Sequence, residues 1–336
     1  MQINNSTVAV DQRRAELDGW VASRLGAAEL QGVPASSDAS FRRYFRYLHG
    51  GRSVIAMDAP PDREDCRPFV QVAQLLQRAG VHVPAVLAQD LERGFLLLQD
   101  LGRETYLDVL DEHNADALFD DALGALLALQ QAPPGPLPRY DEALLRRELE
   151  LFPQWYLQRH LGLTLDARWR TVLERSFRLL IDSALAQQYV LVHRDYMPRN
   201  LMRSDPNPGV LDFQDAVIGP ISYDPVCLFR DAFISWPEQR VAGWLQTYWQ
   251  RARAAGLPVP DQFEAFQRDC DWMGAQRHLK VIGIFARIRY RDGKPAYFED
   301  IPRFFDYLAQ VAERYRELAP LRELLALVQA ASAGRP

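Results

Sequence analysis

The feature that most constrains this 336-residue chain is a polar loop enclosed by two short apolar runs. The first run is Tyr189–Val192, and the second is 209–211, which ends on Asp212. Short apolar runs bounded by turn residues and prolines are typical of buried strands. The loop after the first run includes His193, Asp195 and Asn200. The pattern therefore predicts two strands that deliver imidazole, carboxylate and amide groups to one site.

These side chains suit phosphoryl transfer. The spacing H-x-D-x-x-x-x-N, followed by a strand that ends in Asp, resembles the catalytic layout of ATP-dependent phosphotransferases with a kinase-like fold. That layout implies that Asp195 accepts the proton of the attacking hydroxyl and that His193 supports the loop. It also implies that Asn200 and Asp212 give oxygen ligands to Mg²⁺. A single aspartate after a strand more often caps a turn, but two strand-ending motifs in this order favour the catalytic interpretation.

Two differences separate this chain from the eukaryotic protein kinases. Phe213-Gln214-Asp215 follows Asp212 where those enzymes carry F-G, and no A-P-E segment follows. The sequence H-R-D-Y-M-P-R-N with V-L-D-F-Q-D instead resembles the aminoglycoside-phosphotransferase-like superfamily of small-molecule kinases. Within it, the chain is similar to the bacterial kinases that phosphorylate the anomeric hydroxyl of N-acetylmuramate and N-acetylglucosamine. Four segments carry this resemblance: 37–46, 193–202, 209–233 and 276–287.

The resemblance implies an α+β, two-lobed protein-kinase-like fold. Residues 1–100 would form a nucleotide-binding lobe with an antiparallel sheet of about five strands. Residues 101–336 would form a larger, mainly helical lobe with the catalytic loop and the acceptor site. Residue patterns in the first part predict strands at 41–48, 53–57, 83–88 and 94–98 and helices at 11–25 and 67–79. Patterns in the second part predict helices at 114–130, 144–160, 166–188, 224–233, 237–255, 261–290, 302–318 and 321–331.

Composition limits the classes of function. The net charge of -5 argues against a nucleic-acid-binding protein, which usually carries a basic face. No run approaches the ~20 apolar residues of a membrane span, and residues 1–11 lack the layout of a secretory signal. The 3 cysteines lack metal-ligand spacing, so they predict neither a disulfide framework nor a zinc site. We therefore expect a cytoplasmic enzyme with a small-molecule substrate and no nucleic-acid or membrane partner.

The nucleotide-binding residues depart from the kinase pattern. Ser37 and Ser40 lie in a serine-rich segment at the place of the phosphate-covering loop, where hydroxyl and backbone N–H groups can contact phosphate. The returning strand carries Met57 where a phosphate-binding lysine is expected. The next helix carries Gln71 where the glutamate partner of that lysine is expected. The lysine and its partner are therefore both missing.

Arginines on the preceding strand can replace the missing lysine, because a guanidinium group binds phosphate through two hydrogen bonds. Strand alternation places Arg42 and Arg46 on one face and Arg43 on the other, so only one of these sets can reach the nucleotide. Arg43 is the favoured candidate. The alternative is that each of these arginines is a solvated surface residue.

The segment Leu98-Gln99-Asp100-Leu101-Gly102 is an apolar strand that breaks at a polar joint. In kinase-like folds this joint is the hinge whose backbone groups bind the adenine edge. The resemblance therefore implies that Gln99 and Leu101 contact the nucleotide. An ordinary connection between a strand and a helix is the alternative, and the order of the elements favours the hinge.

Asp224 opens a predicted helix beyond the second catalytic strand. We expect it to cap that helix and to support the catalytic loop. The superfamily often has a second aspartate three residues later, where this chain has Cys227. The sequence therefore leaves this task to Asp224 alone.

The resemblance implies that the acceptor binds between the catalytic loop and the C-terminal helices. The candidates are Asp215, Arg277 and Lys280, and the last two share a helix face at positions i and i+3. A pair of cations suits an amino sugar that bears a carboxylate, as N-acetylmuramate does. Solvated helix charges are the alternative. An aminoglycoside is a polycation and would instead need carboxylates, which residues 261–271 contain.

The sequence therefore predicts an ATP- and Mg²⁺-dependent phosphotransferase that acts on the C1 hydroxyl of N-acetylmuramate and N-acetylglucosamine in peptidoglycan recycling. The reaction type follows from the residues, and the sugar and the pathway follow from the resemblance. An aminoglycoside or other small-molecule hydroxyl kinase is the nearest alternative. A non-catalytic nucleotide-binding module is the alternative of another class, because the strand lysine is missing, although Asp195, Asn200 and Asp212 are present.

Overall fold

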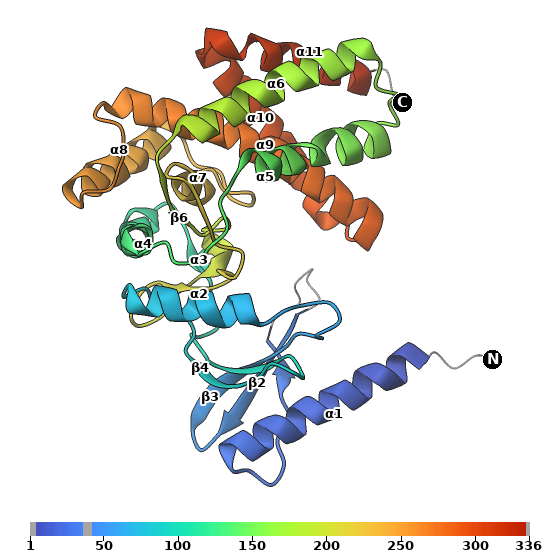
Figure 1. Cartoon of the computed structure of the whole chain (residues 1–336), viewed down its shortest axis with the longest axis vertical. Coiled ribbons are helices and arrows are strands. Elements are labelled where there is room, and N and C mark those ends of the chain that lie inside the picture. Colours follow the sequence, from blue (N-terminus) through green and yellow to red (C-terminus); the bar gives the residue numbers. More distant parts are fainter. Residues whose placement is uncertain (1–4, 36–41, 334–336) are drawn as a thin grey trace. The chain divides into compact units, whose positions relative to one another are not determined.

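The computed structural model describes residues 5–35 and 42–333, with side chains from residue 12 onward (Figure 1). By its internal contacts the chain divides into two compact units. Unit 1 comprises Met1–Asp111 and Arg199–Asp215, and unit 2 comprises Glu112–Pro198 and Ala216–Pro336. The segment Arg199–Asp215 therefore groups with the N-terminal part of the chain. The predicted lobe boundary at residue 100 stays a sequence-based prediction.

Unit 1 contains an antiparallel sheet with the strand order β1-β2-β3-β5-β4. Its strands are β1 (Val33–Pro34), β2 (Arg43–His49), β3 (Arg52–Asp58), β4 (Val86–Asp90) and β5 (Phe95–Gln99). Gly50 and Gly51 join β2 to β3 with φ values of 57° and 75°. A two-residue hairpin turn of the favoured hand needs positive φ at both positions, which glycine adopts without strain.

Helix α1 (Asn5–Leu25) covers one face of this sheet. The buried cluster between helix and sheet consists of Leu17, Trp20 and Val21 of α1 and of Phe45, Tyr47, Val54, Ala56, Phe95 and Leu97 of the strands. Successive strand residues point to opposite faces of a sheet. Arg43 therefore shares the α1 face with Phe45 and Tyr47, whereas Met57 and Arg46 lie on the opposite face.

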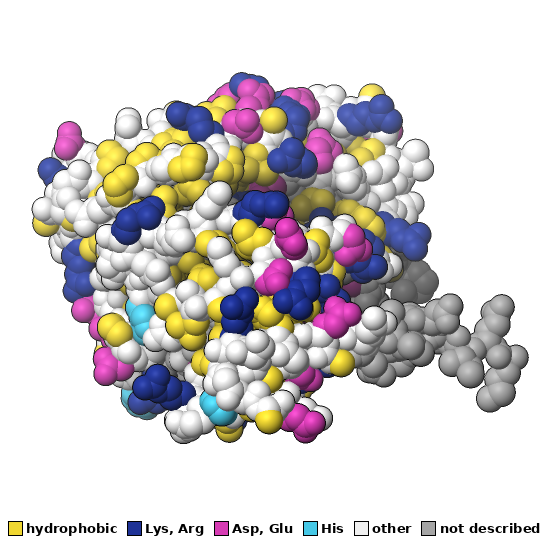
Figure 2. Space-filling model, turned by 60° about the horizontal axis from the view of Figure 1, so that its bottom comes forward, with side chains coloured by type: hydrophobic (Ala, Val, Ile, Leu, Met, Phe, Trp, Pro, Cys, Tyr) yellow, Lys and Arg dark blue, Asp and Glu magenta, His cyan; other side chains and the backbone are white. Residues whose placement is uncertain are grey.

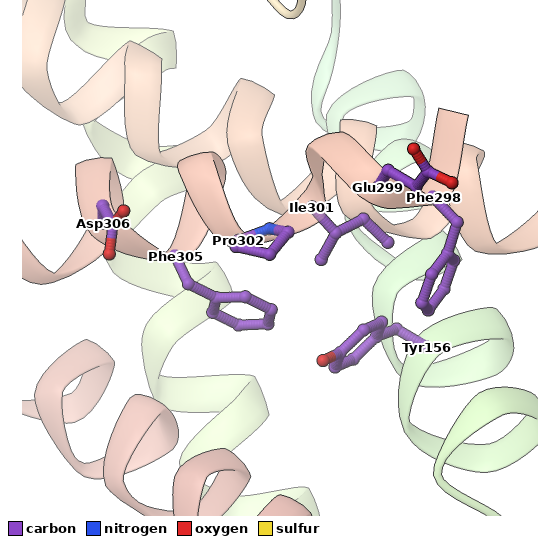
Figure 3. A pocket seen from close by; sticks show the side chains of 7 residues that line it. All are labelled: Tyr156, Phe298, Glu299, Ile301, Pro302, Phe305 and Asp306. Atoms are coloured by element: carbon purple, nitrogen blue, oxygen red, sulfur yellow. The ribbon is translucent and has the colours of Figure 1, made fainter. Parts of the chain in front are cut away.

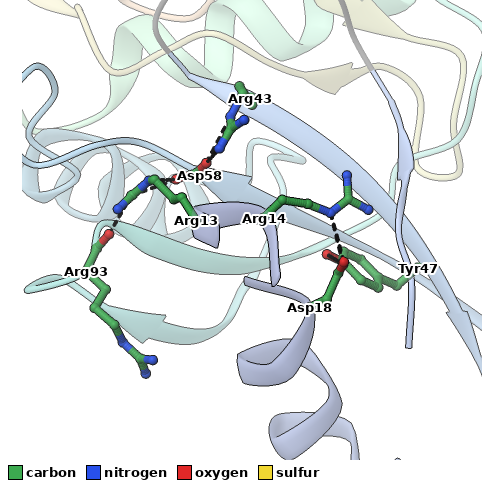
Figure 4. A network of polar contacts seen from close by, with 7 residues as sticks. All are labelled: Arg13, Arg14, Asp18, Arg43, Tyr47, Asp58 and Arg93. Carbon is green, nitrogen blue, oxygen red and sulfur yellow. Dashed lines mark hydrogen bonds and ion pairs between the residues drawn. The ribbon is translucent and has the colours of Figure 1, made fainter. Parts of the chain in front are cut away.

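Two polar clusters tie α1 to the sheet (Figure 4). In the first, Arg13 Nε donates to Asp58 Oδ1 at 2.7 Å, and Arg43 Nε donates to Asp58 Oδ2 at 2.9 Å. The second cluster consists of Arg14, Asp18 and Tyr47. Asp58 is fully buried, and its two guanidinium partners supply the charge compensation that a buried carboxylate requires. Arg43 is therefore anchored on the α1 side of the sheet.

Backbone hydrogen bonds hold the segment Arg199–Asp215 to the earlier part of unit 1. The earlier part also contains α2 (Arg67–Arg78) and α3 (Tyr106–Val109). The segment contains the hairpin strands β7 (Leu201–Met202) and β8 (Gly209–Val210), and η2 (Pro198–Asn200) spans the sequence boundary between the units. The N–H of Arg203 donates to the carbonyl of Glu104, and the N–H of Val210 donates to the carbonyl of His82. These bonds explain why a segment far along the chain belongs to unit 1.

Unit 2 is mainly helical, with one pair of short strands, β6 (Tyr189–Val192) and β9 (Val217–Pro220). Its α-helices are α4 (Ala115–Gln131), α5 (Glu142–Leu149), α6 (Ala167–Ala186), α7 (Tyr223–Phe229), α8 (Glu238–Ala254), α9 (Phe263–Asp292), α10 (Ile301–Arg314) and α11 (Ala319–Ala333). It also contains the π-helix η1 (Phe152–His160) and the short 3₁₀-helices η3 (Ala296–Asp300) and η4 (Arg316–Leu318). Helix α9 contacts η1, α6, α7, α8 and α10, which is why it is buried along most of its length.

The predicted helix 144–160 is two elements. Helix α5 ends at Leu149, and η1 (Phe152–His160) is a π-helix. The backbone at Leu151 lies so close to α9 that a Cβ atom on Gly283 would be 2.4 Å from the Leu151 carbonyl carbon. A glycine at this crossing lets the two backbones meet.

The prediction of a small antiparallel sheet and a mainly helical remainder is confirmed. Strand β1 was not predicted, because two exposed residues carry no periodic signal. Among residues 5–35 and 42–333, no helix combines the length and the apolar character of a membrane span. On the face that Figure 2 shows, basic and acidic side chains of the described residues are interspersed and do not form large areas of one sign.

Candidate active site

The loop at residues 193–198, in unit 2, is held at its start by a buried carboxylate. Asp224 of α7 accepts the N–H of His193 at 2.7 Å and the N–H of Arg194 at 3.0 Å. Burial raises the pKa of Asp224 to about 7, although these two N–H groups lower it. Helix α7 begins at Tyr223 after Ser222, so the prediction that Asp224 caps this helix is wrong. Its carboxylate holds the loop backbone instead.

The backbone of Arg194 has a conformation that residues with side chains rarely adopt. Its φ is 76°, in the left-handed region, directly before Asp195. The Cys227 thiol donates to the carbonyl of Arg194 at 3.3 Å. Such a conformation costs roughly 1–2 kcal/mol and persists where the surroundings fix it. Here α7 binds both the N–H and the carbonyl group of Arg194.

The other residues around Asp195 are also fixed. His193 Nδ1 accepts the N–H of Asp195 at 3.2 Å. The Tyr196 hydroxyl donates to the carbonyl of Ala122 at 2.7 Å. His193 and Tyr196 are buried, whereas Asp195 is partly exposed. The arrangement can therefore present the Asp195 carboxylate to a substrate on a backbone that is held in place.

In unit 1, Asn200 and Asp212 lie side by side. Asn200 Nδ2 is 3.5 Å from Asp212 Oδ2, and the N–H of Leu211 donates to the carbonyl of Asn200 at 2.9 Å. Gln214 Nε2 donates to Asp212 Oδ1 at 2.7 Å. Asp212 has a φ of 61°, and Asp215, three residues later, is exposed. The β7–β8 hairpin thus brings together the amide and the carboxylate that the sequence predicts as metal ligands.

The donor set of this pair fits Mg²⁺. A protein usually binds this ion through one or two carboxylates, while water and substrate phosphates fill the other positions. In the part of the chain that the structure describes, no three His, Cys, Asp or Glu side chains gather as a metal site. A carboxylate and an amide oxygen from Asp212 and Asn200 are therefore suited to a nucleotide-bound Mg²⁺ rather than to a metal held by protein alone.

Each of the three arginines considered as a replacement for the strand lysine forms an ion pair with an acidic side chain. The three pairs are Arg42–Glu64 at 2.9 Å, Arg43–Asp58, and Arg46–Asp100 at 2.6 Å. Met57 is buried on the face opposite Arg43. A contact between Arg43 and a phosphate would therefore require the guanidinium group to leave Asp58. Ser37 and Ser40 lie outside the described residues.

Asp100 organises the segment predicted as the hinge. Arg46 donates from Nε to Asp100 Oδ2 at 2.6 Å and from Nη2 to Oδ1 at 3.0 Å. The N–H of Gly102 donates to Asp100 Oδ1 at 3.0 Å, and its carbonyl accepts Arg46 Nη2 at 2.5 Å. Gln99 ends β5, and Leu101 is buried. The Arg46–Asp100 ion pair therefore binds both backbone groups of Gly102, the residue after Leu101.

Arg277 and Lys280 of α9 are both buried, unlike the solvated charges that most helices carry. Arg277 Nη1 donates to the carbonyl of Arg230 at 3.3 Å. Lys280 Nζ lies 3.0 Å from Glu148 Oε1 and donates to the Tyr223 hydroxyl at 3.0 Å. Burial would lower the pKa of Lys280, but Glu148 raises it above its ordinary value. Lys280 is therefore a buried, charged partner of Glu148.

Glu148 was not predicted as a site residue from the sequence. This residue of α5 forms ion pairs with Arg194 and Lys280, and its side chain is only 7% exposed. A signal was present, because Glu148 shares a helix face with the buried Leu145 and Leu149. A carboxylate on an apolar face is rarely buried unless a cation pairs with it.

Unit 2 also contains a cavity of about 430 Å³ at η1 and the start of α10 (Figure 3). Its lining residues are Tyr156, Phe298, Glu299, Ile301, Pro302, Phe305 and Asp306. None of the site residues predicted within the described part of the chain is among them. The cavity is therefore distinct from the predicted site.

Sequence comparison connects this arrangement with known proteins. Residues 31–266 match the family described as "Phosphotransferase enzyme family". The chain is 64% identical over 334 residues to the N-acetylmuramate/N-acetylglucosamine kinase of Pseudomonas putida, with coverage of 98% of this chain and 97% of that protein. It is 47% identical over 320 residues to the protein of the same name from Neisseria meningitidis serogroup B, with coverage of 94% and 95%.

Structural comparison concerns the fold. The aminoglycoside phosphotransferase APH(2'')-Ib with bound ADP aligns with a TM-score of 0.61 at 17% identity, over 88% of this chain and 98% of that chain. At this identity the likeness shows the fold alone, which is the kinase-like fold that the sequence predicts. The family match covers more than half of the chain, and both named relatives align over nearly all of it. The chain therefore belongs to the phosphotransferase enzyme family.

Proposed function

We propose that this phosphotransferase moves the γ-phosphoryl group of ATP to the C1 hydroxyl of N-acetylmuramate and N-acetylglucosamine, as a step in peptidoglycan recycling. The observation that carries the proposal is the 64% identity with a kinase named for these two sugars, over 98% of the chain. The fixed backbone of Asp195 and the Asn200–Asp212 pair support it independently.

In this proposal Asp195 accepts the proton of the sugar hydroxyl. The hydroxyl oxygen forms a bond to the γ-phosphorus while the bond from that phosphorus to the β–γ bridging oxygen breaks, which leaves ADP. An anomeric hydroxyl is more acidic than an ordinary alcohol, so Asp195 acts mainly by orientation. His193 and Asp224 maintain that orientation through the loop backbone.

Asn200 and Asp212 would hold a Mg²⁺ ion that neutralises the charge of the transferred phosphate. Gln99 and Leu101 would bind the adenine through their backbone groups, and the bonds from Arg46 to Asp100 would keep that segment in place. Ser37, Ser40 and Arg43 are proposed phosphate contacts. To contact phosphate, the guanidinium group of Arg43 would have to leave Asp58 and bind the phosphate instead.

Asp215 and Arg277 are the proposed acceptor contacts. Arg277 is buried in unit 2. Burial would lower its pKa, but Cys227 and Tyr223, followed by Asp231 and Asp195, raise the pKa above the ordinary value. Lys280, the third candidate, bonds Glu148 and Tyr223 with its ammonium group, so a contact with the acceptor would require it to leave them.

The test is an acceptor screen with ATP and Mg²⁺, in which phosphorus NMR identifies the phosphorylated position. We expect N-acetylmuramate and N-acetylglucosamine to yield the sugar 1-phosphate and kanamycin to yield no product. Phosphate on another hydroxyl would contradict the C1 assignment, and transfer to kanamycin alone would favour an aminoglycoside kinase. Saturable ATP binding without single-turnover transfer to any acceptor would favour a non-catalytic nucleotide-binding module.

A further inference from the structure

Glu148 is a buried carboxylate that joins the 193–198 loop to two other parts of unit 2. The Arg194 guanidinium and the Lys280 ammonium both meet its Oε1 atom, the latter at 3.0 Å. The Tyr140 hydroxyl donates to Oε2, and Gln276 Nε2 lies 3.5 Å from the same oxygen. Helix α5 is therefore connected through one side chain to the loop and to α9.

The charges in this cluster depend on one another. Burial alone would raise the pKa of Glu148, but Lys280 and Arg194 hold it below its ordinary value. Burial alone would lower the pKa of Arg194, but Glu148 raises it. The three groups are therefore ionised at neutral pH, and they carry one more positive than negative charge. Loss of the carboxylate would leave a buried cation, Lys280, and a partly buried one, Arg194, without their shared partner.

The cluster acts on the residue that determines the direction of the loop. Arg194 has a φ of 76°, and the next residue is Asp195. The backbone of Arg194 is bound by Asp224 and Cys227 of α7, and its side chain is bound by Glu148 of α5. Because this conformation is unfavourable by itself, it requires contacts of this kind from the surrounding structure.

We propose that Glu148 is a positioning residue, which holds Arg194 in its left-handed conformation and so orients the Asp195 carboxylate. We propose in addition that Lys280 acts through Glu148 and does not bind the acceptor. This inference rests on the proposed function, because it takes Asp195 as the catalytic residue. It gives the buried Glu148 of α5 and Lys280 of α9 a role in orienting the 193–198 loop.

The first variant is Glu148→Gln, which keeps the shape of the side chain and removes its charge. We expect kcat to fall about 100-fold with N-acetylmuramate and with N-acetylglucosamine, because small misplacements of a reacting group cause losses of this order. The KM values for ATP and for both sugars should stay unchanged. A wild-type kcat in a folded Glu148→Gln variant would overturn the proposal.

The second variant, Lys280→Met, separates positioning from acceptor binding. N-acetylmuramate carries a carboxylate on its lactyl group, and N-acetylglucosamine does not. If Lys280 acts through Glu148, kcat falls by the same factor with both sugars and neither KM changes. A rise in KM for N-acetylmuramate alone would show that Lys280 binds the acceptor carboxylate, which overturns its assignment here.

Asp271→Asn is the matched control. Asp271 is also a buried carboxylate of unit 2 between two cations, Arg230 at 3.3 Å and Arg314 at 2.6 Å, and it accepts the hydroxyl of Tyr315. Its loss should lower the melting temperature about as much as Glu148→Gln, while kcat is retained. If both variants lose kcat in proportion to their loss of stability, Glu148 has only a structural role.

If Glu148→Gln alone does not fold, the double variant Glu148→Gln with Lys280→Met is tested instead, because it keeps the net charge of the cluster. We expect it to fold with a low kcat, and a wild-type kcat would overturn the proposal. The proposed function is tested independently of these variants, and it is wrong if the wild-type enzyme phosphorylates neither sugar. In that case the same variants are compared on the acceptor that the screen identifies.

Discussion

Two residues in and next to the proposed site have a strained backbone conformation. In the ranges that the structure describes, the residues other than glycine with positive φ are Arg194 and Asp212. One directly precedes the proposed catalytic base, and the other is a proposed metal ligand. Such conformations cost free energy and tend to gather at functional sites, where neighbouring groups fix them. The two strained positions therefore support the assignment of Asp195 and Asp212.

Asp195→Ala and Asp212→Ala are each expected to abolish turnover and to leave the fold intact. Loss of a general base alone typically lowers the rate 10²- to 10⁴-fold, or by about 3–5 kcal/mol in the activation free energy. The measurement is the steady-state rate of ADP formation with N-acetylglucosamine, next to a thermal melt. Asp182→Ala, which removes an exposed carboxylate of α6, is the control and should keep wild-type activity. Substantial turnover by the Asp195 variant would remove its proposed role.

At the scale of elements, the crossing of α9 and η1 shows how one glycine permits a helix contact. A Cβ atom on Gly283 would lie 2.4 Å from the carbonyl carbon of Leu151 and 2.6 Å from the N atom of Phe152. Backbone atoms cannot rotate away as the end of a flexible side chain can. The π-helix η1 begins at this contact, and a π-helix often marks a functional region or a local insertion.

Gly283→Ala should therefore destabilise the protein by about 1–3 kcal/mol, which is the usual cost of overfilling a packed contact. The matched control is Gly243→Ala in α8, where nothing lies within 4 Å of the added Cβ. Alanine is the better helix former, so this control should stabilise the protein by about 0.5–1 kcal/mol. Urea unfolding gives both values. Equal effects of the two substitutions would show that the crossing has room for a methyl group.

The elements that the sequence predicts well are those with a strong local signal. Strand β6 matches its prediction at Tyr189–Val192, and α4 differs from its prediction by one residue at each end. The π-helix was predicted as a continuation of α5, because its apolar residues repeat as in any amphipathic helix. The π-helix begins where the backbone meets Gly283, which is 131 positions from Phe152 in the sequence, and no local pattern contains that contact.

At the scale of the whole molecule, buried polar groups are unevenly distributed. Among the described residues, the buried Asp, Glu, Arg, Lys and His side chains belong to unit 2, with the exception of Asp58. The sequence indicates the residues of the 193–215 stretch, since their order and spacing are local. It does not indicate that Glu148, Arg194 and Lys280 meet, because three separate segments contribute to that cluster.

Two buried ionisable groups, Asp224 and His278, make the stability of the fold depend on pH in opposite directions. Burial raises the pKa of Asp224 to about 7, so its protonated form favours the folded state, and this contribution is lost as pH rises from about 4 to 7. His278 behaves in the opposite way. Burial lowers its pKa well below the ordinary value, and Arg277 and Arg230 lower it further. Only a comparison of variants can separate these two effects.

His278→Phe isolates the histidine contribution, because the ring lies against Phe304 and Tyr307 and a phenyl ring can take its place. Below the unfolded-state pKa of about 6.5, the unfolded imidazole binds a proton that the folded one does not, so acid favours unfolding. The free energy of unfolding of the wild-type protein, relative to the variant, should therefore fall by about 1.4 kcal/mol for each pH unit below that value. Urea unfolding at pH 7.5, 6.5, 5.5 and 5.0 measures this difference. The difference should be constant above pH 7, where both imidazoles are neutral, and a constant difference down to pH 5.0 would contradict a neutral, buried His278.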